Sequence, residues 1–281
     1  MNANYHSHGC GWKRGNVWKI DDPDDIRLSP YRDIREKDLV GRQQRFIAEG
    51  KVVLNVLLST SARFETESLL ILENRLAGLN EQLNQLPPNV PVYSVPQAVM
   101  DKVAGFHVHR GILAIGYRRP QPGLQAMLQA LPEKSLVVVL CGISNHDNVG
   151  SIFRNAAAFE ADCVLMDETC CDPLYRKAIR VSVGAALKVP FFHGSSIDEI
   201  IATLGDAGFN LLALSPSSPL SIYEADRHDR LALLLGTEGE GLPARLLQKL
   251  QSSRIPMSSA FDSLNVATAS GIALSRFSKF S

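Results

Sequence analysis

The stretch "LVVVLCGISNHDNVGSIFRNAAAFEADCVLMD" (136–167) contains two apolar runs separated by an amphipathic segment. The runs "LVVVLCG" (136–142) and "CVLMD" (163–167) have the continuous apolar character of strands that are buried on both faces. From Asn148 onward the intervening residues show apolar side chains at helical spacing. A strand, a helix and a second strand in this order predict parallel strands. Arg154 is a charged residue among the apolar neighbours of this helix, and its position calls for an explanation.

The same alternation continues to the end of the chain. Apolar, strand-like runs separated by helical patterns follow at 189–193, 210–215, 231–236 and 253–257, and a helical pattern closes the chain at 264–280. This pattern predicts a parallel sheet with helices on both faces, and ligands of such sheets bind beyond the carboxyl ends of the strands. Four loops that follow strands are candidates for that position: "ISNHDNVG" (143–150), "SPSSP" (215–219), "GTEGEGLP" (236–243) and "SSAFDSLN" (258–265).

The first part of the chain has shorter elements. Strand-like runs at 45–50, 68–73, 90–95 and 111–118 alternate with helical patterns, which favours a small mixed or parallel sheet covered by helices. Two prolines and a glycine in "RRPQPG" (118–123) mark a boundary. The expected organisation of this α/β protein is a flexible arm (1–36), a first domain (37–119), a linker with a leading helix (120–133) and a second domain (134–281).

Composition limits the class of protein. The chain has 281 residues, of which 45% are apolar and 21% charged, values typical of a soluble globular protein. No apolar run reaches the ~18 residues that a membrane span needs, and the first residues lack the apolar core of a secretory signal; we therefore expect a cytoplasmic protein without a membrane partner. The net charge is zero, with +3 over 1–119 and −3 over 120–281. This asymmetry leaves room for a basic face in the first part.

The cysteines do not indicate a metal site or a disulfide framework. There are five of them, at irregular spacing, without a C-x-x-C pair. Cys141 and Cys163 lie in strand-like runs, where a thiol acts as a small apolar side chain. His6, His8 and Cys10 could bind a metal, but a disordered tail explains them more simply. We expect no metal.

One motif points to a different class of enzyme. "GEGLPA" (239–244) matches the G-x-G-x-x-A fingerprint of dinucleotide-binding proteins. That fingerprint belongs after the first strand of its unit and is followed by an acidic residue at the end of the next strand, and neither condition holds here. In addition, Glu238 and Glu240 would face the pyrophosphate of the ligand, which is unfavourable. A dinucleotide cofactor is therefore not expected.

Three segments together are more specific than any single motif. They are "NVGSIFR" (148–154), "LLLGTEGEGLP" (233–243) and "IPMSSAFDSLNVATA" (255–269). Their order and spacing resemble the three motifs of the SpoU (TrmH-like) family of RNA 2′-O-ribose methyltransferases, within the SPOUT superfamily, and "AIRVSVGAALKVPFF" (178–192) is similar to the segment between those motifs. The resemblance covers 134–281, and residues 37–119 resemble the small RNA substrate-binding domain, related to a ribosomal-protein fold, that many members carry.

The resemblance implies a fold and an activity. The fold is a parallel-sheet catalytic domain with a C-terminal trefoil knot, which periodicity alone would not indicate. The activity is methyl transfer from S-adenosyl-L-methionine to a ribose 2′-hydroxyl of rRNA or tRNA, carried out by a homodimer. Because the hydroxyl holds its proton at neutral pH, such an enzyme must align it with the methyl group, and alignment can contribute on the order of 7–11 kcal/mol.

Residue roles follow from the positions that match the motifs. Arg154 matches the family's motif arginine; since a guanidinium keeps its proton below about pH 12, we expect it to hold a phosphate or to stabilise developing negative charge rather than to act as a simple base. Asn148 is expected at the start of its helix, as an N-cap that also orients Arg154 or the ribose. Ser263 and Asn265 are expected to cap the last helix beside the transfer centre. The catalytic candidates implied are Arg154, Asn148, Glu238, Ser263 and Asn265.

Cofactor and RNA contacts are expected at separate places. Gly236, Ile255 and Leu264 match cofactor-contacting positions, because glycine permits close approach and the aliphatic side chains can flank adenine. In the first domain, basic side chains are candidates for phosphate contacts. These RNA-binding candidates are Arg42, Arg45, Arg110 and Arg118, with Arg119, His107 and His109 nearby in sequence.

Two other classes of function remain open. One is a catalytically silent RNA-binding protein of the same fold, although such a protein would be expected to lack Arg154 or the "SLN" motif (263–265). The other is a nucleotide-dependent α/β enzyme that acts on a small molecule.

Overall fold

The computed structural model describes residues 16–32, 44–59, 63–105, 107–258, 260 and 262–280. The chain divides into two compact units. The first unit contains 1–119 and Leu174–Lys188, and the second contains Pro120–Pro173 and Val189–Ser281. The first change of unit falls between Arg119 and Pro120, where the sequence predicts the linker to begin.

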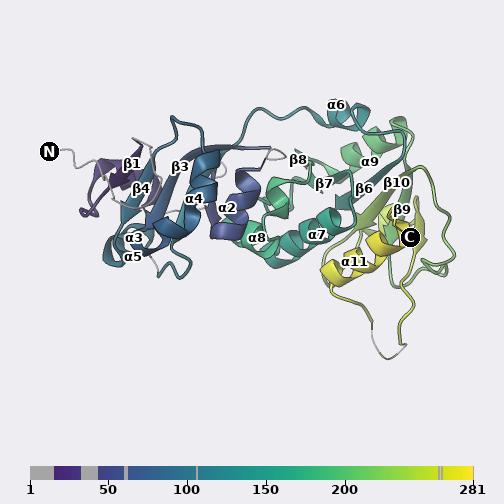
Figure 1. Cartoon of the computed structure of the whole chain (residues 1–281). Coiled ribbons are helices and arrows are strands. Elements are labelled where there is room, and N and C mark those ends of the chain that lie inside the picture. Colours follow the sequence, from purple (N-terminus) through teal and green to yellow (C-terminus); the bar gives the residue numbers. More distant parts are fainter. Residues whose placement is uncertain are drawn as a thin grey trace. The chain divides into compact units, whose positions relative to one another are not determined.

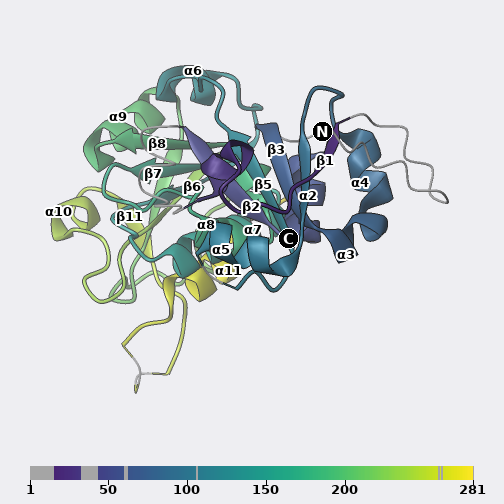
Figure 2. The ribbon, with the colours of Figure 1, turned by 90° about the vertical axis from the view of Figure 1, so that its left-hand side faces the viewer.

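The first unit is built on a mixed five-stranded sheet, in the order β1-β4-β3-β5-β2. Strands β1, β4 and β3 are parallel, and β5 runs antiparallel to both β3 and β2. In Figure 2, α3 and α4 lie to one side of this sheet and α5 to the other. The strands are β1 (Val17–Lys19), β2 (Arg45–Glu49), β3 (Glu65–Leu72), β4 (Val92–Val95) and β5 (Ile112–Tyr117). The helices are η1 (Ile26–Tyr31), α2 (Lys51–Leu57), α3 (Glu73–Leu76), η2 (Ala77–Leu79), α4 (Asn80–Gln85), α5 (Gln97–Ala104), α8 (Arg176–Val181) and η3 (Ala185–Leu187).

The prediction of a flexible arm over 1–36 is wrong for residues 16–32. Strand β1 pairs with β4, and the side chains of Leu28 and Tyr31 in η1 are completely buried. The hydroxyl of Tyr31 lies 2.7 Å from that of Ser68 in β3. The acidic, proline-containing sequence of this segment did not indicate that Leu28 and Tyr31 belong to the core. A short 3-10 helix has too few turns to show a periodic apolar pattern. Residues 1–15 and 33–36 lie outside the described residues.

A segment from the second half of the sequence completes the first unit. Residues Leu174–Lys188 pack against β2 and α2, and in Figure 1 the green helix α8 lies beside the blue helix α2. Arg176 of α8 forms an ion pair with the buried Glu49 of β2 at 3.9 Å. Gly184 approaches α2 so closely that an added Cβ would lie 3.1 Å from Val56. The sequence did not predict that this segment belongs to the first unit, because helical periodicity does not indicate which sheet a helix covers.

The second unit is built on a six-stranded parallel sheet, in the order β11-β9-β10-β6-β7-β8. The parallel α/β sheet that the sequence predicts is therefore confirmed. Its strands are β6 (Ser135–Leu140), β7 (Cys163–Asp167), β8 (Phe191–Ser195), β9 (Asn210–Leu214), β10 (Arg230–Leu235) and β11 (Gln251–Ser253). Its helices are α6 (Leu124–Gln129), α7 (His146–Ala158), α9 (Ile197–Asp206), α10 (Ala244–Leu247) and α11 (Val266–Phe277).

Both faces of this sheet are covered. Apolar side chains of α6, α9 and α10 pack with Val137, Leu165 and Leu234 on one face, while α7 and α11 contact each other and lie below the strands in Figure 1. The chain runs from β6 towards β8 on one side and from β9 to β11 on the other, so the strand order reverses between β6 and β10. Ligand sites of parallel sheets lie at such a reversal. No helix of the described residues is long and apolar enough to cross a membrane.

Candidate active site

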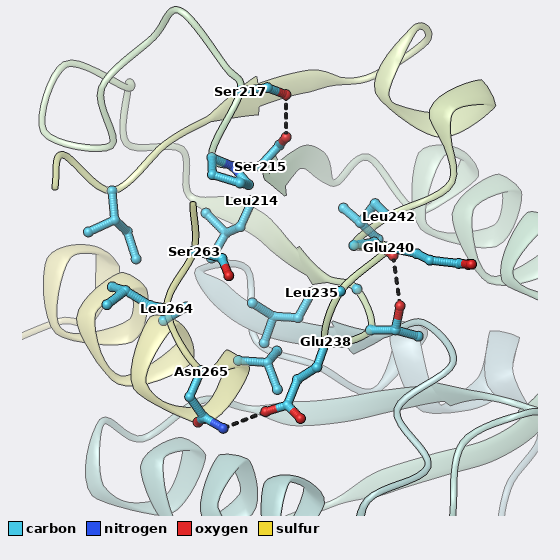
Figure 3. A pocket seen from close by; sticks show the side chains of 18 of the residues that line it. Leu214, Ser215, Ser217, Leu235, Glu238, Glu240, Leu242, Ser263, Leu264 and Asn265 are labelled. Carbon is cyan, nitrogen blue, oxygen red and sulfur yellow. Dashed lines mark hydrogen bonds between the residues drawn. The ribbon is translucent and has the colours of Figure 1, made fainter. Parts of the chain in front are cut away.

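Three of the four predicted loops form one pocket at the carboxyl ends of β9, β10 and β11. The cavity has a volume of about 530 Å³, within the range of small-molecule sites. Its walls come from the loop after β9 (215–217), the loop after β10 (236–242) and the segment before α11 (263–265), which converge in Figure 3. These strands are neighbours in the sheet, so loops far apart in sequence meet.

The loop after β10 folds back on itself through its backbone. Thr237 and Gly241 exchange two backbone hydrogen bonds of 3.2 and 3.1 Å, and Gly239 and Gly241 adopt positive φ angles of 91° and 71°. A Cβ added at Gly236 would overlap the backbone of Gly241. Glycine is therefore required at 236 for packing and is favoured at 239 and 241 for conformation. The G-x-G-x-x-A match arises from this turn, which is why it resembles a dinucleotide fingerprint without being one.

Asn265 connects the three motifs. Its Oδ1 accepts backbone hydrogen bonds from Ala267 (2.9 Å) and Thr268 (3.3 Å) and so caps α11, as predicted. Its Nδ2 donates to Oδ1 of Asn148 (3.0 Å) and to Oε1 of Glu238 (2.6 Å), and the second of these bonds is visible in Figure 3. Because both partners offer oxygen acceptors, the amide orientation is determined on all sides. Ser263 lines the pocket but is not the cap.

Asn148 is not an N-cap, which corrects the prediction. The cap of α7 is Asn145, whose Oδ1 accepts a hydrogen bond of 2.8 Å from the backbone of Asp147. Asn148 lies inside the first turn, with 6% of its surface exposed, and bonds Asn265 instead. Both residues are asparagines close to the helix start, and spacing within one turn does not distinguish them.

The packing of α7 on α11 holds this connection in place. Nδ2 of Asn155, one position after Arg154, donates to the carbonyl of Ala267 (2.8 Å) and to the hydroxyl of Ser270 (2.9 Å). An added Cβ at Gly271 would lie 3.3 Å from the same nitrogen. The side-chain amide thus replaces part of the apolar contact between two closely packed helices. Sequence reasoning missed Asn155, since a polar residue on an amphipathic helix resembles a solvent-facing one.

The predicted cofactor residues are brought together. Gly236, Ile255 and Leu264 all line the pocket, and the side chain of Leu264 is 37% exposed. Leu214, Leu235 and Val266 add apolar surface, and the carboxylates of Glu238 and Glu240 lie at the rim. Ser215 and Ser217, whose hydroxyl oxygens are 2.9 Å apart, were missed as individual residues, although their loop was predicted.

Arg154 is not brought into the pocket. It is exposed, and it makes no hydrogen bond or ion pair with any residue that the structure describes. At about 100° per residue, six residues place it roughly 240° around the helix axis from Asn148. The helix therefore points Asn148 towards Asn265 and Arg154 to the surface.

The predicted RNA-binding arginines differ in their surroundings. Arg45 forms an ion pair with Glu67 at 2.6 Å, and Arg119 forms one with Glu65. Arg118 is half-buried, whereas Arg110 is exposed and makes no ion pair with a described residue. Arg42 lies outside the described residues. Of the described candidates, Arg110 has the side chain most available to a ligand.

The cysteines near the sheet are protonated at neutral pH. Burial raises the pKa of Cys141 to about 12 and that of Cys171 to about 12, and it raises the pKa of Cys170 further. Such thiols are neither nucleophiles nor ready metal ligands. Across the described part of the chain, no group of three or more His, Cys, Asp or Glu side chains could hold a metal ion.

Sequence comparison identifies the family of the second unit. Residues 135–275 match the model of the SpoU rRNA Methylase family. The chain belongs to this family. An uncharacterized tRNA/rRNA methyltransferase of Mycobacterium bovis is 41% identical over 268 residues, which are 92% of this chain and 90% of that protein. The resemblance inferred from the three motifs is thus confirmed.

Solved structures show the same fold. An AdoMet-bound rRNA methyltransferase from Sinorhizobium meliloti matches with a TM-score of 0.78 at 21% identity, covering 93% of this chain and 97% of its own. An RNA 2′-O ribose methyltransferase matches with a TM-score of 0.74 at 24% identity, covering 92% and 97%. At these identities the likeness extends to the fold, and the chemistry must be argued from the site.

Proposed function

We propose that this SpoU-family protein transfers a methyl group from S-adenosyl-L-methionine to a ribose 2′-hydroxyl of structured RNA, either rRNA or tRNA. The observation that carries the proposal is the hydrogen-bonded connection of Asn148, Asn265 and Glu238 at the rim of the pocket. It joins all three motifs at one point, where an acceptor hydroxyl would have to lie.

The pocket fits the cofactor that is expected of this family. Gly236 lets the backbone form a close wall, and Leu214, Ile255 and Leu264 supply the apolar surface that an adenine ring needs. When bound, the cofactor supplies an electrophilic methyl group on a positively charged sulfur. Glu238 and Glu240 favour that positive charge, whereas they would oppose the pyrophosphate of a dinucleotide. The electrostatics therefore separate this proposal from a nucleotide-dependent enzyme.

The chain's own residues must position the hydroxyl and take up its proton. In the reaction an oxygen–carbon bond forms as the carbon–sulfur bond breaks, S-adenosylhomocysteine leaves, and the hydroxyl proton passes to the carboxylate of Glu238 and from there to water. Glu238 and Asn148 present oxygen atoms that can accept a hydrogen bond from the ribose, and Asn265 fixes both of them. We assign Ser263 a supporting contact, since it lines the same wall. Preorganised contacts of this kind contribute most of the rate enhancement in many enzymes.

Arg154 is assigned to the RNA and not to the proton. An unpaired guanidinium on the surface of α7 suits a phosphate beside the target ribose, because its planar fork can bind two oxygen atoms. Next to it, a groove between α7 and α11 is lined by Asn155, Phe159 and the 60% exposed Tyr223. We propose that a second copy packs on this face and encloses Arg154 in a homodimer. The C-terminal knot and a cytoplasmic location remain predictions of the same proposal.

The test is transfer of a labelled methyl group to total RNA from cells that lack the gene. Wild type, Arg154→Ala and Arg245→Ala are compared; Arg245 is a surface arginine of the second unit that pairs with Asp198. We expect label on ribose 2′-oxygens, a loss of about 10²-fold in Arg154→Ala, and little change in the control.

The outcomes separate the rival functions. Label on a base, or an equal rate in both arginine variants, would contradict the proposal. Cofactor binding without any label in RNA would favour the catalytically silent RNA-binding protein. Absence of S-adenosylhomocysteine binding would overturn the methyltransferase assignment of the pocket itself.

A further inference from the structure

A second cavity, of about 610 Å³, lies in the first unit, whereas the site described above belongs to the second. Its lining comes from α2, from α3 and η2, from the turn before β5, and from α8. The polar side chains among the described lining residues are all basic: Lys51, Arg75, His109, Arg110 and Arg180. No Asp or Glu is among these described residues.

The cations of this pocket are not neutralised by any carboxylate that the structure describes. Arg75, Arg110 and Arg180 make no ion pair with any carboxylate in the described part of the chain, and Lys51 donates only to the carbonyl of Gly78, at 2.8 Å. The acidic residues close to them in sequence are used elsewhere: Glu73 pairs with Lys19 and Glu49 pairs with Arg176. Four like charges around one cavity repel each other, so the arrangement favours an anionic ligand.

Two glycines place the arginine side chains. An added Cβ at Gly50 would lie 2.7 Å from Cδ of Arg110, and one at Gly111 would lie 3.2 Å from Cγ of Arg75. Both glycines have positive φ angles, 90° and 65°. The aliphatic stems of these two arginines therefore lie across bare backbone, where a side chain would displace them. Both residues are exposed, so their guanidinium groups are open to a ligand.

The pocket also has an apolar wall. Val52 is 53% exposed and Val183 is 38% exposed, and both are among the few large apolar side chains at the described surface. Val183 has a φ angle of +54°, an unfavourable conformation for a β-branched residue. It occupies the position after α8 that is usually glycine, because its N–H bonds the carbonyl of Arg180 and that of Gly184 bonds the carbonyl of Ile179. A valine kept there at a conformational cost suggests a role for its side chain.

We propose that this pocket binds a nucleotide of the RNA substrate. The three arginines and Lys51 hold consecutive backbone phosphates, and Val52 and Val183 contact the sugar or the base. The inference rests on the proposed function, since it names a place in the first unit where the RNA substrate of that reaction is held. Arginine is the residue suited to this task, because its fork matches two phosphate oxygens. Four cations exceed what one free nucleoside monophosphate needs, whereas each further phosphodiester of an RNA adds one charge.

The experiment measures RNA binding directly, with the full chain and without cofactor. The double variant Arg110→Gln/Arg180→Gln is compared with wild type and with Arg27→Gln/Lys102→Gln. The control variant lowers the charge of the same unit equally, at residues that form ion pairs with Asp25 and Asp24. End-labelled total RNA from cells that lack the gene is the probe, and binding is followed between about 50 and 200 mM salt.

We expect the pocket variant to bind RNA at least about tenfold more weakly than wild type at low salt. The slope of the logarithm of the binding constant against the logarithm of the salt concentration should become smaller in magnitude by about 1 for each lost phosphate contact. The control variant should match wild type in slope. The same preparations are tested for S-adenosylhomocysteine binding and for methyl transfer to RNA.

Three results would overturn the inference or separate it from the proposed function. Equal affinity and slope in pocket and control variants would overturn it. The inference would also be overturned if wild type bound uridine monophosphate at low concentration, the pocket variant did not, and RNA binding were unchanged in the pocket variant. The pocket would then be a site for free nucleotides. The salt dependence of RNA binding could change in the pocket variant while wild type and both variants all fail to transfer methyl groups. That result would support RNA binding by this pocket and contradict the proposed function.

Discussion

The two pockets of this protein are built in opposite ways. In the second unit, the polar groups at the rim are paired with each other: Asn265 makes four hydrogen bonds, to Ala267, Thr268, Asn148 and Glu238. In the first unit, Arg75, Arg110 and Arg180 surround a cavity without an ion-pair partner among the described residues. In the second unit, three polar side chains are hydrogen-bonded to each other before a ligand binds, whereas in the first unit the positive charges are compensated only by a ligand.

This difference indicates what each pocket must do. A reaction centre needs its dipoles fixed before the substrate arrives, because reorganisation during the reaction costs rate. A docking site for a polyanion gains affinity by exchanging counterions for phosphates, and unpaired cations serve that exchange. The paired pocket should therefore be sensitive to small changes of shape, and the unpaired pocket to changes of charge and salt.

Gly236→Ala should have the largest effect. The added methyl group would overlap the backbone of Gly241, so the loop after β10 must move and the cofactor wall is lost. We expect S-adenosylhomocysteine binding to fall by more than about 10²-fold, as for other overpacked sites, and methyl transfer to fall with it. Isothermal titration with S-adenosylhomocysteine measures the effect.

The matched control is Gly205→Ala, in α9 of the same unit. An added Cβ there meets no atom within 4 Å, and its backbone is helical. This change should leave cofactor binding as in wild type and stabilise the protein by about 0.5–1 kcal/mol. Equal binding by Gly236→Ala and Gly205→Ala would show that the close approach at Gly236 does not shape the pocket.

Asn265→Asp should have the next largest effect. The carboxylate can still cap α11, but it places an oxygen against Oε1 of Glu238 and Oδ1 of Asn148, where Nδ2 now donates at 2.6 and 3.0 Å. Leaving polar groups unpaired in this way costs about 1–3 kcal/mol, which corresponds to a loss of roughly 10–100-fold in kcat/KM. The free energy of unfolding should fall by no more than about 1–3 kcal/mol, since the cap of α11 is retained.

Asn265→Ser separates the two roles of this residue. A serine caps a helix nearly as well as asparagine, but its short side chain does not reach Glu238 and adds no charge. The loss of activity should be smaller than in Asn265→Asp. The free energy of unfolding should be similar in the two variants. Equal or stronger inactivation by serine than by aspartate would mean that the negative charge placed against Glu238 is not what inactivates Asn265→Asp.

The sequence predicted the strands of the sheets better than the segments that pack against them. The continuous apolar runs that became β6, β7, β9 and β10 are a strong signal, because a strand buried on both faces has few alternatives. By contrast, η1 and the segment that contains α8 gave no sign that Tyr31 and Arg176 belong to the sheet of the first unit. Those contacts join residues far apart in sequence, and no local pattern reports them.

The candidate site shows the same limit. Motif positions placed Gly236, Glu238 and Asn265 at one pocket, since each follows a strand at the same edge of the sheet. Helical rotation, however, turns Arg154 away from Asn148, a geometric fact that motif spacing alone does not express. The pocket of the first unit was foreseen only through His109 and Arg110, because Lys51, Arg75 and Arg180 come from three different elements.

Val183→Gly should have the smallest effect, and its sign is informative. Relief of the left-handed conformation of a β-branched residue outweighs the extra freedom that glycine gains on unfolding, so we expect the free energy of unfolding to rise by about 0.5–1 kcal/mol. RNA binding should weaken slightly, because the apolar wall is lost.

Val52→Gly is the matched control: it removes the same side chain from an ordinary helical position in α2 and should destabilise the protein by about 1 kcal/mol. Urea unfolding of both variants measures the difference, and destabilisation of equal size would show that the conformation of Val183 carries no cost. A gain in stability with a loss in RNA affinity would instead mean that the unpaired pocket, unlike the paired one, is maintained at the expense of the fold that carries it.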